Sequence, residues 1–186
     1  MVSQTFAGTP LTPLYRVVSS ALGTPVSNAA PNQSTTFNTN IPSIDYYLNI
    51  RRTRWFMGHS AMGVPGANAS VQVFALLSES TSKTSVVSTD TQFLDIFMRE
   101  YTIWFSTAAG FIFDGPNSNR EGIETHFFAE GVPTIATKLN LVASAIANVG
   151  NLGATNWLPA VQVEFELLPI TSTIRDYLSK RIQIQQ

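Results

Sequence analysis

The sequence predicts an all-β protein: an antiparallel two-sheet β-sandwich (jelly roll) with an extended N-terminal arm and a short C-terminal helix or tail. The clearest evidence is the stretch from Val161 to Leu167, where apolar residues alternate strictly with Gln162, Glu164 and Glu166. Such alternation is typical of a strand with one buried face. About seven or eight stretches of this kind, joined by turns and without repeating strand–helix units, indicate two packed antiparallel sheets.

The composition fits one domain whose surface is partly covered by other subunits. The chain has 186 residues, of which 44% are hydrophobic and 12% charged. That charged share is about half the usual one, and an isolated soluble monomer usually keeps more charge. We therefore expect much of the surface to be buried in subunit contacts.

The charge distribution argues against strong nucleic-acid binding through a basic arm. The formal net charge is −1, and Arg16 is the only Lys or Arg among the first fifty residues. An arm that neutralises phosphates needs many cations. The chain has no cysteine, which fits folding in a reducing compartment. We also expect no signal peptide and no transmembrane segment, because no apolar run approaches the ~20 residues of a membrane helix.

Residues 1–43 are predicted to form the extended arm, because Ser, Thr, Asn and Gly are frequent there and five prolines interrupt them. Its one apolar segment is Leu14-Tyr15-Arg16-Val17-Val18. Such a segment can lie along a neighbouring subunit, and the alternative is a loose terminus.

Residues 44–169 are predicted to form the sandwich. In its first strand, 44–57, alternation places Leu48 and Ile50 on one face and Arg51, Thr53 and Trp55 on the other. Residues 71–77 are apolar on both faces, as expected of a central strand.

The middle of the sandwich is harder to assign from pattern alone. We predict a short helix or turn at 92–98, followed by strands at 100–106, 110–113, 123–129 and 135–143, with a break at 131–133 between the last two. Aromatic and β-branched residues favour a strand at 100–106, whereas the spacing before it also fits a helix.

Residues 170–186 are predicted to form an amphipathic helix capped by Ser172. Its apolar face would carry Ile174, Tyr177, Leu178 and Ile182. The alternative is an extended tail.

Candidate chemical sites are few, and we predict no catalytic residue, no metal site and no cofactor. Ser60 follows a histidine between two glycines, but the spacing departs from Gly-x-Ser-x-Gly by one residue. Glu121, Glu124 and His126 could approach a metal, but the chain has only two histidines and a solvated strand face explains the pattern better.

The only concentration of positive charge is Arg51, Arg52 and Arg54, among Tyr46, Tyr47 and Trp55. This resembles a nucleic-acid platform. Alternation would place Arg52 and Arg54 on the face opposite Arg51, so we favour an intersubunit or structural ion-pair role.

Taken together, the proline-rich arm, the strands from Tyr46 to Leu167, the Ser/Thr/Asn loops and the short tail resemble a viral capsid protein of the single jelly-roll type. The resemblance implies a structural protein, not an enzyme, that folds in the host cytoplasm and assembles into the virion with copies of itself and other virion proteins. The chain departs from many small capsid proteins in lacking an Arg/Lys-rich arm, which points towards a phage or archaeal virus.

The resulting subunit-interface candidates come from the arm, the arginine cluster and the tail: Leu14, Tyr15, Val17, Arg51, Arg52, Arg54, Ile174, Tyr177, Leu178 and Ile182. For the tail, packing over an open sheet edge of the same chain is the alternative. A second hypothesis is a carbohydrate- or ligand-binding sandwich, such as a virion spike or lectin-like domain, in which Trp55, Trp104 and Trp157 stack on sugar rings.

Overall fold

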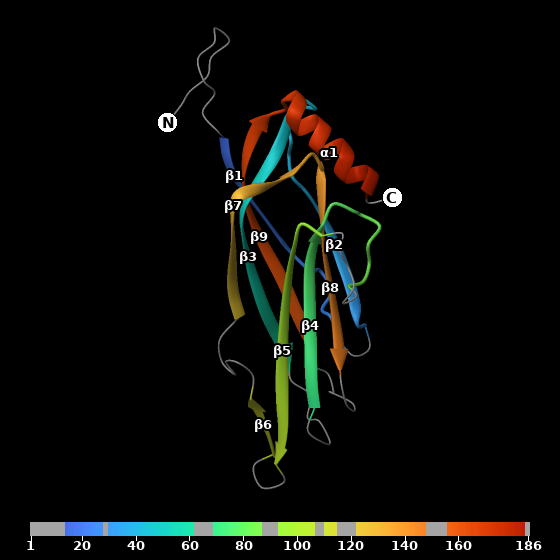
Figure 1. The fold of residues 1–186 in the computed structure, drawn as a ribbon. Helices are drawn as coiled ribbons and strands as arrows, with labels where there is room; N and C mark the ends of the chain where they lie inside the picture. Colours follow the sequence, from blue (N-terminus) through green and yellow to red (C-terminus); the bar gives the residue numbers. More distant parts are fainter. Residues whose placement is uncertain are drawn as a thin grey trace.

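The computed structural model describes residues 14–27, 30–61, 69–86, 93–106, 110–114, 122–147 and 156–184. These form two β-sheets packed face to face, with one helix across an end of the sandwich (Figure 1). The elements are β1 (Leu14–Ala21), β2 (Asn32–Asn38), β3 (Tyr46–Ala61), β4 (Ala69–Ser78), β5 (Asp95–Ser106), β6 (Gly110–Asp114), β7 (Gly122–Thr134), β8 (Lys138–Ala147), β9 (Asn156–Pro169) and α1 (Ser172–Ile184).

The fold is a jelly roll, as predicted, and its strand order follows from the structure. One sheet has the order β1-β9-β3-β7 and the other β2-β8-β4-β5-β6, and every pair of neighbours is antiparallel. Strand β6 extends the second sheet beyond β5. Without it each sheet has four strands: the first contains the pairs β1 with β9 and β3 with β7, and the second contains the pairs β2 with β8 and β4 with β5. This is the double Greek-key arrangement of eight-stranded jelly rolls.

The core lies between the sheets and is filled by large side chains. Trp55, Trp157, Phe97 and Phe165 are each at most 1% exposed, and the rings of Trp55 and Phe97 stack with centroids 5.9 Å apart. The alternation predicted for β9 is confirmed, because its apolar residues from Val161 to Leu167 are all buried. Close packing of this kind is the main source of stability in a sandwich.

Strand β4 is central and buried on both faces, as predicted. Val73, Ala75 and Leu77 face the main core. On the other face, Phe74 and Leu76 form a second cluster with Val86 and Val142. The segment after β4 covers this cluster and is held to β8, because Asn140 Nδ2 donates to the carbonyls of Ser80 and Lys83 at 3.1 and 2.7 Å.

The prediction of an arm over residues 1–43 is wrong from Leu14 onward; residues 1–13 lie outside the described chain. β1 pairs with β9 over eight residues, from Leu14 opposite Leu167 to Ala21 opposite Ala160. β2 likewise pairs with β8 along its whole length. Both β1 and β2 are edge strands, whose sequences lack the strong apolar alternation of interior strands. In β2, for example, the half-buried positions include the polar residues Gln33 and Thr35 as well as Phe37.

Two further predictions in the middle of the chain are wrong. The helix or turn expected at 92–98 is strand from Asp95, because pairing with β4 places Phe97 in the core and Met98 outside. The break expected at 131–133 is part of β7, which continues to Thr134. Gly131 allows this by taking a φ of 80°, and the register against β3 shifts at this point.

The C-terminal helix is confirmed, although its cap is Thr171. The Thr171 hydroxyl accepts a hydrogen bond from the Ile174 N–H at 3.3 Å, so Ser172 is already the first helical residue. Leu178 is buried (4% exposed) and Tyr177 is exposed. Within the described residues, no helix is long and apolar enough to cross a membrane.

Candidate functional site

The outer face of the sheet β1-β9-β3-β7 carries the arginine cluster. In β3 the register against both neighbouring strands shifts between Ile50 and Arg52. This β-bulge reverses the alternation, so that Ile50 and Thr53 both point into the core. The prediction that Arg51 lies opposite to Arg52 and Arg54 is therefore wrong, and all three lie on the outer face.

The three arginines bind two glutamates of the adjacent strand β9. Arg52 makes a two-pronged contact with Glu164, with Nε 2.8 Å from Oε2. Arg54 Nη2 lies 3.7 Å from Glu164 Oε1, and Arg51 Nε lies 3.1 Å from Glu166 Oε2. These residues form an ion-pair stripe along the middle of the face, in which the cations are engaged within the chain.

Glu166 is the most enclosed member of the ion-pair stripe, with its side chain 8% exposed. The Tyr15 hydroxyl donates to its Oε1 at 2.5 Å, and Asn49 Nδ2 lies 3.5 Å from its Oε2. The hydrogen bond to Glu166, and then its negative charge, raise the pKa of Tyr15 above its ordinary value. Edge strand β1 is thereby tied to β9 by a side-chain bond as well as by the backbone.

Exposed apolar side chains flank the ion-pair stripe on both edges of the sheet. On β1 these are Tyr15 (67% exposed) and Val17 (55%), and on β7 they are Ile123 (56%) and Phe127 (73%). The Arg52 guanidinium lies over the Phe127 ring, 5.5 Å from its centroid. We call this surface, the stripe with its two apolar edges, the outer face.

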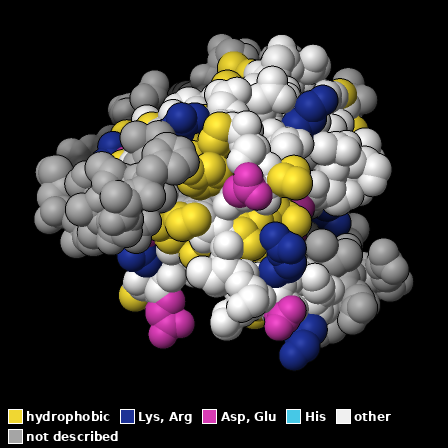
Figure 2. Space-filling view, turned by 90° about the horizontal axis from the view of Figure 1, so that it is seen from above, with side chains coloured by type: hydrophobic (Ala, Val, Ile, Leu, Met, Phe, Trp, Pro, Cys, Tyr) yellow, Lys and Arg dark blue, Asp and Glu magenta, His cyan; other side chains and the backbone are white. Residues whose placement is uncertain are grey.

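A second apolar surface lies at the end of the sandwich that carries α1. Figure 2 shows this end from above, with hydrophobic side chains gathered in its middle. A hollow of about 250 Å³ is lined there by Ile41, Ser43, Ile44, Tyr46, Ile135, Thr137 and Ile170. Ile44 is 90% exposed, which is costly for an aliphatic side chain in water.

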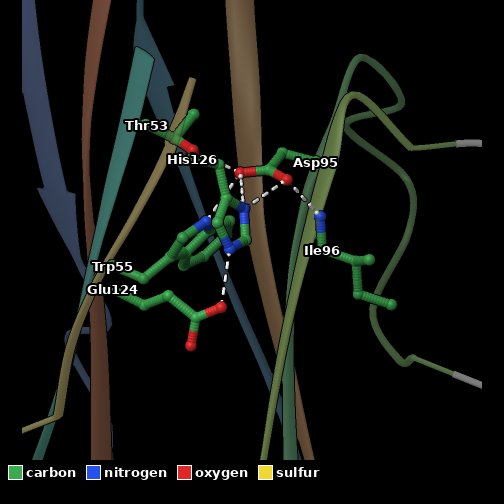
Figure 3. Close-up of polar contacts among 6 residues, drawn as sticks. All are labelled: Thr53, Trp55, Asp95, Ile96, Glu124 and His126. Carbon is green, nitrogen blue, oxygen red and sulfur yellow. Dashed lines mark hydrogen bonds and ion pairs between the residues drawn. The ribbon is translucent and has the colours of Figure 1, made fainter. Parts of the chain in front are cut away.

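A polar cluster links the two sheets inside the sandwich (Figure 3). Asp95 of β5 accepts hydrogen bonds from the Thr53 hydroxyl and, at 2.7 Å, from the Trp55 indole, both on β3. His126 of β7 bonds Asp95 through Nδ1 and Glu124 through Nε2. The cluster is satisfied by its own members, so its geometry is that of a structural network.

The other residues singled out from the sequence lie partly in the core and partly outside the described residues. Ile174 is half-buried, while the side chains of Leu14 and Ile182 lie outside the described part of the structure. Trp55 and Trp157 are in the core and cannot stack on a sugar, and the Trp104 side chain is not described. Glu121, Gly63 and the side chain of Ser60 also fall outside the described residues. The other subunit-interface candidates lie on the outer face or on α1, and Glu124 and His126 belong to the polar cluster.

Sequence reasoning missed Glu164, Glu166 and Asp95. The alternation in β9 shows that both glutamates point away from the core, but their partners on β1 and β3 are more than 100 residues away in the chain. Asp95 gives no local signal, because Thr53 is 42 residues away and His126 is 31 residues away.

No family model and no curated protein matches the chain. Several solved structures similar to it come from viruses. A chain of Desmodium yellow mottle tymovirus is 14% identical, with 92% of this chain and 90% of that chain covered and a TM-score of 0.39. Merkel cell polyomavirus VP1, solved in complex with GD1a oligosaccharide, is 9% identical, with 92% and 98% covered and a TM-score of 0.36. A nodavirus of the giant freshwater prawn Macrobrachium rosenbergii, solved as a semi-empty VLP, is 6% identical, with 91% of each chain covered and a TM-score of 0.26. Identities and TM-scores this low transfer no function, which has to follow from this chain's own surfaces.

Proposed function

We propose that this chain is a structural protein that self-assembles into a viral capsid shell. The observation that carries the proposal is the outer face, where exposed Tyr15, Val17, Ile123 and Phe127 flank charges already paired within the subunit. Exposed apolar side chains of this size, grouped on one face, mark a surface that is covered in the working assembly.

The paired charges make this face suitable for burial. A subunit contact that buried unpaired arginines would have to remove their hydration at a cost of several kcal/mol per ion. Here Arg52 and Glu164 already satisfy each other, so a neighbour needs only to cover their apolar flanks. Only 12% of the residues are charged, and this low share also favours burial of the surface in subunit contacts.

The filled interior favours a structural role over a ligand-carrying one. Jelly rolls also occur in lectins and in enzymes of the cupin type, so the fold by itself does not select a function. In this chain Trp55, Trp157, Phe97 and Phe165 occupy the space between the sheets. The carbohydrate-binding alternative also loses two of its three candidate tryptophans to the core.

The proposal extends to the virion as the site of action and to copies of the chain, with other virion proteins, as partners. The arginine cluster supports a shell that does not condense its genome through this surface, because each arginine is directed at Glu164 or Glu166. A phage or archaeal virus whose genome enters by another route remains the proposed source.

The test is the native mass of the purified full-length chain by light scattering, with negative-stain microscopy of the same sample across concentration and salt. The proposal expects closed particles, sheets, pentamers or hexamers. A chain that stays monomeric or trimeric under all these conditions would contradict it and would make glycan binding the next experiment.

A further inference from the structure

The Asp95 cluster connects the two sheets through one carboxylate. Asp95 opens β5 in one sheet and is 7% exposed, and its three side-chain donors, Thr53, Trp55 and His126, all belong to the other sheet. Three side-chain donors from two strands therefore converge on a single buried charge. Such a convergence fixes the spacing between β5 and the strands β3 and β7.

His126 stands between two carboxylates. Its Nδ1 lies 2.8 and 3.0 Å from the Asp95 oxygens, and its Nε2 lies 2.9 Å from Glu124 Oε1. A carboxylate only accepts hydrogen bonds, so each contact needs an N–H on the ring. Only the protonated imidazolium carries an N–H on both nitrogens.

We infer that His126 is a proton-dependent clasp between Glu124 of its own strand β7 and Asp95 of β5 in the facing sheet: as the ring loses a proton, the Glu124 contact opens, while the bond to Asp95 that ties β7 to β5 loses its ionic character but persists. The inference concerns a single subunit and goes beyond the proposed function, since it does not require assembly.

The two contacts of the clasp, with Asp95 and with Glu124, differ in burial, and this difference decides which of them opens. Asp95 is buried and holds three other hydrogen bonds, including one from the Ile96 N–H at 2.9 Å. Glu124 has a side chain 46% exposed and lies on the same strand as His126. When the ring becomes neutral, its remaining proton stays on Nδ1 against Asp95. The bare Nε2 then faces the Glu124 carboxylate (Figure 3), whose side chain is exposed enough to turn to solvent.

The charged groups that face the ring are Asp95 from β5 and Glu124 from β7, while β3 contributes Thr53 and Trp55, which do not titrate in this range. Partial burial lowers the pKa of His126, but the hydrogen bonds to Glu124 and Asp95 and their charges outweigh it and raise the pKa above 6.5. A histidine whose pKa is raised by folding stabilises the fold fully below its unfolded pKa. That stabilisation is lost as the pH rises through the folded pKa.

The direct test is an NMR titration of the His126 imidazole in the full-length chain, assigned with His126→Gln. The matched pair of variants is Glu124→Gln and Glu130→Gln, because both remove one carboxylate from β7 and Glu130 is exposed. We expect a wild-type pKa above 6.5 that falls in Glu124→Gln and is unchanged in Glu130→Gln. A wild-type value at or below 6.5, or equal shifts in the two variants, would overturn the inference.

Thermal unfolding between about pH 6 and about pH 8 gives an independent readout. The wild-type melting temperature should fall more over this range than that of Glu124→Gln, because the side-chain amide that this substitution introduces can donate to a neutral Nε2. Equal pH dependence in both proteins would overturn the clasp. Native mass recorded on the same samples keeps a failure of the clasp distinct from a failure to assemble.

Discussion

The hydroxyl oxygen of Tyr15 lies 2.5 Å from Oε1 of Glu166, so the first described strand of the chain is bonded by a side chain to the last one. Glu166 in turn contacts Arg51 and Asn49 of β3, on its other side. One enclosed carboxylate thus connects β1, β9 and β3 on the outer face. The same Tyr15 ring remains 67% exposed and available to a neighbouring subunit.

Glu166→Ala is expected to destabilise the subunit. The change leaves the Arg51 guanidinium and the Asn49 amide without their shared acceptor, at a cost of about 2 kcal/mol. Urea unfolding followed by circular dichroism measures it, with Glu130→Ala on β7 as the exposed control. A loss no greater than that of the control would show that Glu166 does not hold the strands together.

Asp95→Asn is expected to cost more, about 3 kcal/mol, because a buried charge with several donors is replaced by an amide that directs its own N–H groups at them. The comparison is Asp45→Asn, in an exposed loop, where we expect a change within about 0.5 kcal/mol. The free energies of unfolding of both variants, measured by chemical denaturation at the same pH, test this prediction. Similar values for the two would mean that the cluster contributes little to the fold.

Gly131→Ala tests the irregular pairing of β7. The φ of 80° is strained for any residue with a Cβ, and the added atom would collide with the Asn49 side chain. A loss of about 2 kcal/mol or more is expected. Gly23→Ala is the matched control, since a Cβ there meets nothing within 4 Å. Equal stability of the two variants would show that the bulge adapts freely.

The sequence predicts two of the interior strands well, because the apolar pattern of each is uninterrupted: β9 alternates between the core and the surface, and β4 is apolar on both faces. β9 and β4 are found where the pattern places them, and so is α1. The apolar pattern does not predict a strand that forms through backbone pairing with its neighbour more than through burial of its own side chains. The edge strand β2 has a largely polar sequence, and only its bonding to β8 makes it a strand.

The outer face could be predicted only in part for a different reason. A bulge adds one residue to a strand without any marker in the side chains, so the reversal at Arg51 is invisible to a rule of strict alternation. The sequence shows the three arginines of the ion-pair stripe as a cluster of positive charge. Their partners Glu164 and Glu166 follow only from the order of strands in the sheet.

Substitutions of Leu178 and Tyr177 distinguish the two roles proposed for the C-terminal helix, which are packing on its own subunit and contacting a neighbouring subunit. Leu178→Ala should cost about 3 kcal/mol of subunit stability, because the side chain is 4% exposed and its removal leaves a cavity. Tyr177→Ala should leave the unfolding free energy nearly unchanged, since the ring is 52% exposed. If Tyr177→Ala nevertheless weakens assembly in light scattering, the helix serves both the subunit and its neighbour. Unchanged assembly would restrict the helix to packing within its own chain.

Phe127 provides the sharpest test of the outer face. Its ring is 73% exposed and packs against Arg52, so Phe127→Thr should change subunit stability little while keeping a residue suited to a strand. If the ring is a central contact between copies, losing it weakens that contact by about 2 kcal/mol. The concentration needed for assembly should then rise by about 30-fold, because 1.4 kcal/mol corresponds to tenfold. Met98→Thr removes a comparably exposed side chain from the other sheet and should leave that concentration unchanged. Light scattering across a dilution series compares the two variants, and equal assembly by Phe127→Thr and the wild type would exclude the outer face as the contact between subunits.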